Sequence, residues 1–387
     1  MHVVIVGGGF AGLKTALELS KRHVGKITLI SDKPYFLHHA TLYATAMGKS
    51  TEESVIPLAT IIADHPSIEI IEDTAQSLDP HRKLLRGDAR DYHYDKLVLA
   101  LGSTTSFKGV KGLSRHAFGV TTLAEIREFQ DHIQDSLVRQ KLDKEFFVIG
   151  AGLTGVEIAA ALRDHLASLV SLYRLRQTTP RVTLVERESR ILPHHSARAA
   201  RTIAKHLKHM GIRQLTNCTV TELSGDTITI NGQIHSTSTA IWTSGVANNP
   251  FYQANRGYFT FTKSGKVRVN PYLEALDDVY VIGDNNDVRY SGMSLPALKQ
   301  ATHVAKNITR LITKRPQLAF RPSSVPLGLP VGSKWGYVEW FGLHATGSVG
   351  KVLRRWMELY SYCQLLPFRE ALPIWRSHDV TDVDDIF

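Results

Sequence analysis

The chain has 387 residues, of which 43% are hydrophobic, and it contains 28 glycines. This length and composition allow two or three α/β domains with large buried cores and exclude a disordered or fibrous chain. The net charge of +10 suits a surface for anionic nucleotides and lipid headgroups, or ordinary solubility. Because the basic residues form no nucleic-acid-binding signature, we expect no nucleic-acid partner. The two cysteines, Cys218 and Cys363, lie far apart in sequence, a pattern typical of a reducing compartment.

The first predicted unit is an apolar strand over 3–6 that leads into a glycine fingerprint and a helix. The fingerprint glycines are Gly7, Gly9 and Gly12. In a dinucleotide site they allow a tight turn, close approach of a pyrophosphate, and packing of the helix on the strand. The pyrophosphate then rests on the N–H groups at the positive end of the helix. A single motif of this kind also occurs as plain structure.

The second strand, KITLIS at 26–31, is the place where such domains carry an acid that holds the ribose hydroxyls. Ser31 occupies the end of this strand, and Asp32 follows it. We take Asp32 as the candidate ribose ligand, with a solvated turn before Pro34 as the alternative. Residues 95–107 then form an apolar strand and a turn at Gly102, where the chain leaves the first domain.

A second fingerprint follows a predicted helix at 121–133, and its glycines are Gly150, Gly152 and Gly155. The partner strand RVTLVE ends at Glu186, 31 residues after Gly155. This spacing exceeds the usual ~20 residues, so we expect an extended connection between helix and strand. A carboxylate at Glu186 accepts from both ribose hydroxyls and repels a 2′-phosphate, which predicts NADH over NADPH. The neighbouring Arg187 and Arg190 leave the opposite preference open, because a guanidinium can accommodate that phosphate.

The segment 239–250, with Gly245, mirrors the earlier turn, and 277–288, with Asp284, returns to the first domain. The predicted fold is therefore α/β, with two Rossmann-like dinucleotide-binding domains, the second inserted in the first. We place the first domain at 1–115 and 245–315 and the inserted domain at 116–244. A C-terminal segment, 316–387, carries an amphipathic helix. Two complete fingerprints predict two nucleotides facing each other, for which a flavin and a nicotinamide are the usual pair.

The ordered motifs VIVGGGFAGL, LVLALGS, VIGAGLTGVEIAAAL, VTLVERESRILP, IWTSGV and VYVIGD resemble those of the two-dinucleotide-binding-domain flavoproteins. Within this superfamily the chain is most similar to the type II NADH:quinone oxidoreductases. The resemblance implies non-covalent FAD in the first domain and NADH in the second. It further implies that NADH passes a hydride to FAD and that two electrons continue to a membrane quinone, without proton pumping. The enzyme is then expected on the cytoplasmic side of the cell membrane, as a peripheral protein.

Three departures narrow the family. The segment PYFLHHATLYATAMG at 34–48 lacks the redox cysteine pair of the disulfide reductases, which excludes dithiol chemistry. Sulfide:quinone oxidoreductases need cysteines near the flavin, and Cys218 and Cys363 lie elsewhere in the sequence. After the Gly-Asp turn, the Ala-Gln motif of the quinone side is replaced by LPALKQATHVAKNI, with Leu295 where its first Gln stands. This last departure concerns the quinone pocket more than the fold.

The resemblance assigns roles to individual residues. Glu157 is expected near the carboxamide or on the quinone side of the flavin, or else is a plain first-turn helix acid. Asp284 is expected to accept from a ribityl hydroxyl, with a turn aspartate as the alternative, and Ala75 to meet the adenine through its backbone. The helix that begins with Pro296, Lys299 and Gln300 should point at the pyrimidine end of the flavin. The candidate catalytic residues are Glu157, Gln300 and Lys334, although Lys334 could equally be a lone surface lysine.

Two aromatic residues and two histidines remain open. Trp335 and Tyr337 line a flat quinone slot or pack in a core. His38 and His39 make polar or packing contacts beside the flavin, and we expect no metal site because no acid or cysteine lies at ligand spacing.

The C-terminal segment shows an apolar helical face from Lys351 onward. Its members recur at steps of three and four residues: Val352, Leu353, Trp356, Leu359, Tyr360, Cys363 and Leu366. Lys351, Arg354 and Arg355 crowd the first turn, and 315–376 carries eight Lys/Arg against three Glu, a net +5. The pattern predicts a helix in a bilayer interface; a core helix or a homodimer contact is the alternative.

Two other functions fit the same motifs. A soluble NAD(P)H-dependent reductase of a small iron protein would need no lipid. A redox-sensing flavoprotein would bind FAD and NADH with little turnover.

Overall fold

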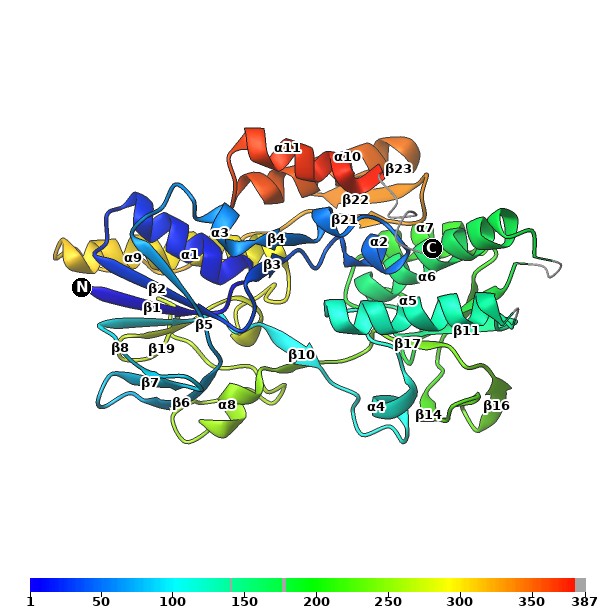
Figure 1. The fold of residues 1–387 in the computed structure, drawn as a ribbon, viewed down its shortest axis with the longest axis horizontal. Helices are drawn as coiled ribbons and strands as arrows, with labels where there is room; N and C mark the ends of the chain where they lie inside the picture. The colour runs from blue at the N-terminus through cyan, green and yellow to red at the C-terminus, as the bar shows by residue number, and fades with distance from the viewer. Residues whose placement is uncertain (140, 176–178, 380–387) are drawn as a thin grey trace.

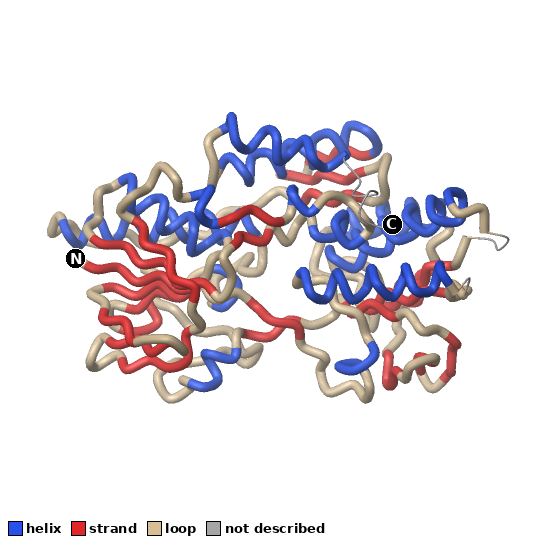
Figure 2. Tube along the Cα trace, in the orientation of Figure 1, coloured by secondary structure: helices blue, strands red, loops and turns tan. Residues whose placement is uncertain are grey.

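The computed structural model describes residues 1–139, 141–175 and 179–379. Two sheets lie side by side along the long axis of the molecule, and a C-terminal layer spans the junction between them (Figure 1). The same view coloured by secondary structure shows the strands concentrated in these two bodies, with helices over them (Figure 2).

The first sheet has six strands in the order β19-β20-β9-β1-β2-β5 and is parallel except for the β19–β20 pair. Its strands are β1 (His2–Val6), β2 (Lys26–Ser31), β5 (Ile68–Glu72), β9 (Lys96–Leu99), β19 (Glu274–Leu276) and β20 (Val279–Val281). Because side chains alternate along a strand, Val3 and Ile5 of β1 point to the same face of this sheet. That face is covered by helices α1 (Phe10–Lys21) and α9 (Ser294–Ile312).

The opposite face of this sheet receives Val4 and Val6. It is covered by an antiparallel meander of three strands: β6 (Ala75–Asp79), β7 (Leu84–Gly87) and β8 (Asp91–His93). Both faces are therefore buried, which explains the continuous apolar character of VVIV.

The inserted sheet repeats this plan in the order β13-β12-β11-β17, with every pair parallel. Phe146 and Val148 of the central strand face the helices, and Phe147 and Ile149 face a second meander. The sheet strands are β11 (Glu145–Ile149), β12 (Arg181–Val185), β13 (Arg213–Leu215) and β17 (Ala240–Trp242); the helices are α5 (Leu123–Val138), α6 (Leu153–Leu172) and α7 (Ala197–His209); and the meander is β14 (Val220–Leu223), β15 (Thr227–Ile230) and β16 (Gln233–Ser236). The predicted fold class is confirmed.

The long spacing between Gly155 and Glu186 has a simple cause in the described residues. Helix α6 continues to Leu172, so much of the extra sequence lengthens the helix. Residues 176–178 of the same connection lie outside the described part of the chain.

Two antiparallel strands, β10 (Ser103–Thr105) and β18 (Val246–Asn248), carry the chain between the two bodies (Figure 1). Just after this crossing, Leu113 of the short helix α4 (Leu113–His116) is fully buried against the inserted sheet and its meander. The chain thus joins the inserted domain before residue 115, the predicted boundary, and it returns close to residue 245.

The C-terminal layer joins the two bodies by packing on both. Its three-stranded sheet comprises β21 (Leu327–Pro330), β22 (Gly336–Trp340) and β23 (Leu343–Thr346), followed by α10 (Gly347–Cys363) and α11 (Phe368–Arg376). Leu329 and Tyr337 enter the core around α6, whereas Leu359 and Tyr362 of α10 enter the core around α1 and α9. The relative position of the two nucleotide domains is therefore held by this layer.

Shorter elements complete the fold. They are β3 (Tyr35–Leu37), α2 (Leu42–Ala46), η1 (Thr51–Glu53), β4 (Val55–Pro57), α3 (Leu58–Ile61), α8 (Pro250–Ala254), η2 (Gly283–Asn285) and η3 (Ser377–Asp379). Leu42 and Ala46 of α2 are buried in the core around α6, so a segment of the first domain reaches across to the inserted one.

Candidate functional site

The first fingerprint loop leaves the start of α1 open. Gly7 has φ +115, and a Cβ built there would lie 2.2 Å from the carbonyl oxygen of Ala100. A Cβ on Gly12 would lie 1.9 Å from the carbonyl oxygen of Gly7, so the third glycine permits the close contact of helix and turn. Gly9, the N-cap, has no atom within 4 Å of its Cβ position and no side-chain cap. The N–H groups at the start of α1 are thus free to bind an anion.

The second fingerprint has the same geometry at the start of α6. Gly150 has φ +105, and a Cβ on Gly155 would lie 1.8 Å from the carbonyl oxygen of Gly150. Gly152 has open space at its Cβ position and again leaves the helix uncapped by a side chain. The chain therefore contains two equivalent helix N-termini suited to pyrophosphate.

The ribose-side positions of the two domains differ in their residues. The β1–β2 and β11–β12 pairs have matching registers, which makes Ser31 the counterpart of Glu186. Ser31 is buried beside the fingerprint loop, and Asp32, one residue further, is exposed. Asp32 therefore reaches the ribose position only from outside the strand, and its role stays a prediction.

Glu186 lies directly against the second fingerprint. Its carboxylate accepts from the backbone N–H of Ala151 at 2.7 Å and from that of Glu188 at 3.0 Å. Of the two neighbouring arginines, Arg190 donates to the carbonyl oxygens of Leu192, Pro193 and His195, which occupies its guanidinium. Arg187 is 70% exposed and pairs only with Glu188. The arrangement favours a diol at this position over a 2′-phosphate.

Asp284 lies at the carboxyl end of β20, next to the first fingerprint helix. Its neighbour Gly283 would bring a Cβ within 3.5 Å of Ala11, in the first turn of α1. The Asp284 carboxylate accepts from the Ser103 hydroxyl at 3.2 Å. Gly102 has φ +66 with open space at its Cβ position, and its carbonyl oxygen accepts from Asn285 at 2.7 Å. The LALGS turn and the VYVIGD turn are therefore joined beside the first fingerprint.

The other predicted first-domain contacts are placed as follows. Ala75 begins β6 and is 9% exposed, within the core under the first sheet. Pro296 is buried in the first turn of α9. Gly245, at the second domain crossing, would bring a Cβ within 2.2 Å of the carbonyl oxygen of Ser106. Gly245 is therefore required by the packing of the chain against Ser106, independently of any role in binding a cofactor.

Gln300 does not have the accessibility of a catalytic residue. It is fully buried, and its Oε1 accepts from the backbone N–H of Gly283 at 2.9 Å and from Asn286 Nδ2 at 2.8 Å. Because no part of Gln300 reaches the surface, it holds the Asp284 turn and does not contact a substrate. We correct its predicted catalytic role to that of a positioning residue.

Lys334 lies away from the second fingerprint. It is exposed in the turn between β21 and β22, where Ser333 N donates to Asp164 in the middle of α6. Asp164 is nine residues beyond Gly155, or about 14 Å along the helix axis at 1.5 Å per residue. The alternative interpretation, a surface lysine, is the one that fits this position. Tyr337 is fully buried and donates to Glu339, and Trp335 stacks on His206, so both aromatics pack and neither lines a slot.

The two histidines have different surroundings. His38 is buried, with Nε2 at 2.8 Å from Ser361 Oγ, and burial lowers its pKa to about 3. Enclosure by protein also lowers the pKa of His39, against the opposing negative charge of Asp284. His38 is thus a neutral packing residue, whereas His39 lies within the electrostatic reach of the predicted flavin contact.

Glu157 lies where three parts of the molecule meet: α6, α2 of the first domain and α10 of the C-terminal layer. Its side chain is 12% exposed, and its Oε1 is 3.9 Å from Arg354 Nη2. Burial raises the pKa of Glu157 to about 8, Glu358 adds to the rise, and Arg354 opposes it. The carboxyl therefore carries a proton at neutral pH, the state required of a proton donor.

Sequence analysis missed the charges that surround Glu157. Arg354 and Arg355, assigned to a membrane-facing turn, are 8% and 14% exposed and pair with Glu358. Arg355 also pairs with Glu53. We correct their predicted contact with lipid: both arginines point inward. The Arg354–Glu358 spacing of four residues was a signal for this pair, but the partner Glu53 is too remote in sequence to be found.

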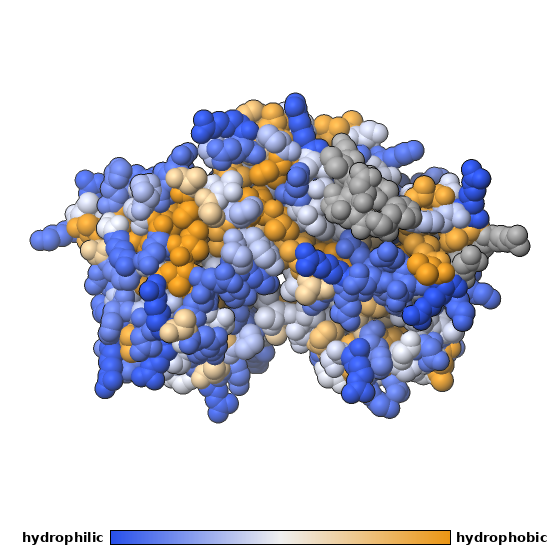
Figure 3. Space-filling model, in the orientation of Figure 1, coloured by the Kyte–Doolittle hydropathy of each residue, from blue (hydrophilic) through white to orange (hydrophobic). Residues whose placement is uncertain are grey.

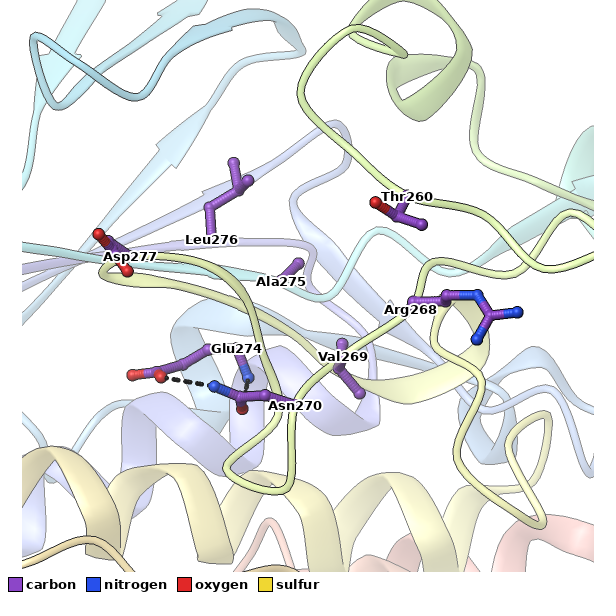
Figure 4. A pocket seen from close by; sticks show the side chains of 8 residues that line it. All are labelled: Thr260, Arg268, Val269, Asn270, Glu274, Ala275, Leu276 and Asp277. Atoms are coloured by element: carbon purple, nitrogen blue, oxygen red, sulfur yellow. Dashed lines mark hydrogen bonds between the residues drawn. The ribbon is translucent and has the colours of Figure 1, made fainter.

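An open pocket of about 340 Å³ lies elsewhere, at the edge strand β19 (Figure 4). Asn270 and Glu274 bond to each other there, with Asn270 Nδ2 donating to Glu274 Oε2 at 3.0 Å. Two strands, β20 and β9, separate β19 from β1 in the sheet, so this pocket lies away from the first fingerprint.

Residues 1–306 match the family described as Pyridine nucleotide-disulphide oxidoreductase. The chain belongs to this family. It is 28% identical over 334 residues to a type II NADH:quinone oxidoreductase of Staphylococcus haemolyticus, covering 80% of this chain and 82% of that protein. The similarity inferred from the motifs is therefore confirmed.

Solved structures of low identity share the fold. A Plasmodium falciparum NDH2 in complex with NADH superposes with a TM-score of 0.86 at 15% identity and covers 97% of each chain. A sulfide:quinone oxidoreductase from Aquifex aeolicus has a TM-score of 0.79 at 21% identity, covering 93% of this chain and 90% of that one.

Within the pyridine nucleotide-disulphide oxidoreductases this chain carries an altered redox site. Both cysteines are free; Cys218 packs beside the β14–β16 meander, and Cys363 packs on the core of the first domain. In a protein of this family, the open α1 terminus with Asp284 fits FAD, and the open α6 terminus with Glu186 fits NADH.

Proposed function

We propose that this pyridine nucleotide-disulphide oxidoreductase is an FAD-dependent NADH:quinone oxidoreductase. When bound, FAD would accept a hydride from NADH and pass two electrons on to the quinone. The residues divide this work: Gly150, Gly152, Gly155 and Glu186 bind NADH, and Gly7, Gly9, Gly12 and Asp284 bind FAD. The relatives named type II NADH:quinone oxidoreductases support the choice of acceptor.

The observation that carries the proposal is the burial of the Glu157 carboxyl where α6, α2 and α10 meet. Quinone reduction consumes two protons as well as two electrons, so an acid must stand near the acceptor. Glu157 is a buried carboxyl with its pKa raised to about 8, at the junction of the inserted domain and the C-terminal layer. A reductase of an iron protein transfers single electrons and needs no such acid.

The C-terminal layer supplies a surface for a membrane. Exposed large apolar side chains gather on the β22–β23 turn and on the outer face of α10 and α11: Trp340, Phe341, Leu343, Val349, Val352, Leu353, Trp356, Tyr360 and Phe368, each 42–80% exposed. We call this set the apolar face. Apolar atoms reach the surface along the upper edge of the molecule, over α10 and α11 (Figure 3). Exposed aromatics in this number typically mark an interaction surface.

The composition of this face differs from the one predicted by periodicity. Leu359 and Leu366 turn into the core, and the β22–β23 turn adds Trp340, Phe341 and Leu343. No described helix is long and apolar enough to cross a membrane. We place the apolar face in one membrane interface because of its exposed aromatic and aliphatic side chains, and on the cytoplasmic side because NADH is available there.

Positive charge reaches the apolar face from the inserted domain. Arg198 at the start of α7 donates to the carbonyl oxygen of Gly342 at 3.1 Å, next to Phe341. Three further basic residues, Arg201, Lys205 and Lys208, follow along the same exposed side of α7, a helix with no acidic residue. This basic stripe replaces the one that Arg354 and Arg355 were expected to form and favours an anionic lipid surface.

An acceptor panel tests the proposed function. Purified holoenzyme is mixed anaerobically with NADH and with a short-chain quinone, a ferredoxin, a rubredoxin or no acceptor. We expect rapid turnover with the quinone only. Faster turnover with an iron protein would favour the soluble reductase, and negligible turnover with every acceptor would favour a redox sensor.

A further inference from the structure

Glu157 and Glu358 are two buried carboxylates that face one arginine. Arg354 Nη1 lies 2.8 Å from Glu358 Oε1, whereas Arg354 Nη2 lies 3.9 Å from Glu157 Oε1. Arg354 and Glu358 are four residues apart on α10, so the helix itself holds them together. Glu157 belongs to α6, a different helix, so its distance from Arg354 is not fixed by the geometry of α10.

A charge count explains which carboxylate keeps a proton. Glu53 and Glu358 are each 1% exposed, and Arg354 and Arg355 balance them. Arg355 pairs with both of these carboxylates, and His378 Nδ1 lies 2.6 Å from the second oxygen of Glu53. The two carboxylates and the two guanidinium groups together carry no net charge. An ionised Glu157 would add an unbalanced negative charge to this buried place, which is costly.

We infer that Glu358 is a positioning residue for the reaction: it holds Arg354 away from Glu157 and so keeps the Glu157 carboxyl protonated. The Arg354 Nε is buried and has no hydrogen-bond partner among the described residues. Its guanidinium is therefore incompletely bonded and can turn toward Glu157 when Glu358 no longer attracts it. The consequence for turnover rests on the proposed role of Glu157, whereas its protonation can be measured independently.

Few other groups can set the protonation of Glu157. From α2 the Tyr43 ring faces it, and burial raises the pKa of this tyrosine well above its usual value, so its hydroxyl stays neutral. Strand β21, which also packs on α6, has no titratable residue, and Glu145 and Arg181 lie at the far ends of β11 and β12. His165 lies two turns further along α6, where burial lowers its pKa to about 4. Besides burial, which is the largest cause of the raised pKa, Arg354 and Glu358 are therefore the charged groups that act on Glu157 among the described residues.

Removing Glu358 and removing Arg354 should shift the pH at which Glu157 loses its proton in opposite directions. E358Q removes a negative charge and frees Arg354, so Glu157 should lose its proton at a pH lower by about one unit or more. R354M removes the cation that acts on Glu157 among the described residues and should raise that pH. R354K keeps the positive charge but lacks the planar guanidinium group. In this variant the pH at which Glu157 loses its proton should lie between the values for R354M and the unaltered enzyme.

The measurement is infrared difference spectroscopy of the FAD-loaded enzyme across pH, with the Glu157 carboxyl band assigned by its loss in E157Q. E53Q is the matched control: Glu53 is an equally buried carboxylate, but it pairs with Arg355 and His378 and not with Arg354. It removes the same charge from the cluster without freeing Arg354, so its Glu157 band should shift in the same direction as in E358Q but by much less. FAD content and thermal unfolding establish that each variant is folded.

An unshifted or upward-shifted Glu157 band in E358Q overturns the inference, as does a shift of equal size in E53Q. If E358Q does not fold, R354M and R354K decide: the inference requires an upward shift that is larger in R354M. Should the infrared shifts occur while E157Q still reduces quinone at the normal rate, the positioning of Glu157 stands and its proposed role as proton donor fails.

Discussion

The backbone N–H of Ala151 donates to the carboxylate of Glu186 at 2.7 Å. This bond ties the second glycine loop to the end of β12, so phosphate recognition and ribose recognition share one rigid corner. We propose the remaining lone pairs of Glu186 as the acceptors for the two ribose hydroxyls.

The Glu186 corner predicts coenzyme preference. Replacing Glu186 with Gln keeps the shape but removes the charge, and the preference for NADH over NADPH should fall about tenfold, corresponding to ~1.4 kcal/mol. The gain for NADPH stays modest because Arg190 is occupied by three carbonyl oxygens and only Arg187 can turn to a phosphate. The kcat/KM ratio for the two coenzymes measures this. An unaltered enzyme that already prefers NADPH would contradict the assignment.

Glu157 predicts the pH dependence of quinone reduction. Its pKa is raised to about 8, so the carboxyl is protonated below this value and loses its proton as pH rises through it. Reoxidation of the enzyme by quinone should therefore slow above pH 8. In E157Q that step should be slower by about 10²-fold and should lose this limb of the profile.

Reduction of the same E157Q enzyme by NADH serves as the internal control, because Glu157 takes no part in binding the ribose or pyrophosphate. Stopped-flow rates of the two half-reactions across pH give both results. If the rate of reoxidation of E157Q by quinone still falls near pH 8, the pH dependence belongs to another group.

Gln300 predicts a separate effect on FAD retention. Q300L removes the acceptor of two buried donors, Gly283 N–H and Asn286 Nδ2, at a cost of about 1–3 kcal/mol for each unsatisfied donor. The Asp284 turn should loosen, so the variant should unfold at a lower temperature and release FAD more readily. Its affinity for NADH should be unchanged, since that site is on the other domain. Equal loss of both nucleotides would indicate general unfolding.

These residues separate what the sequence could predict from what it could not. Glycine spacing demands a particular turn, so the sequence predicted the two fingerprint turns and the positions of Glu186 and Asp284 just beyond the ends of β12 and β20. The binding roles of these two residues stay predictions. The periodicity of α10 distinguished an apolar face from a basic one. It did not show which residues of α10 are buried by the rest of the fold. Arg354 and Arg355 look like surface charges until the remote carboxylates Glu53 and Glu358 are brought against them. The catalytic role of Lys334 stays a prediction; the sequence did not show that its hairpin docks on the middle of α6.

The apolar face predicts membrane binding. W340S/F341S/L343S removes the exposed tip of β22–β23, and partition to liposomes should weaken about tenfold or more, because apolar area is lost from the interface. V138S/L172S/I234S is the matched control, since these residues are 65–78% exposed but lie outside the face. Co-sedimentation with vesicles compares the two. Equal losses in both variants would remove the special role of the apolar face.

The basic stripe of α7 adds a dependence on lipid charge. R201E/K205E should weaken binding to anionic vesicles while leaving binding to zwitterionic vesicles nearly unchanged, and the difference should shrink at high salt. Flavin reduction by NADH should persist, because both side chains point to solvent. If R201E/K205E binds anionic vesicles as strongly as the unaltered protein, the bilayer does not contact α7.

The most direct test of the proposed activity is anaerobic double-mixing stopped flow on the purified protein, followed by its flavin absorbance. The first mixing adds one equivalent of NADH, and the second adds a short-chain quinone. We predict that NADH bleaches the absorbance and that the quinone restores it at least as fast as steady-state turnover, with one quinol formed per NADH. No bleaching by NADH, or a bleached enzyme that an iron protein restores and a quinone does not, would contradict an NADH:quinone oxidoreductase.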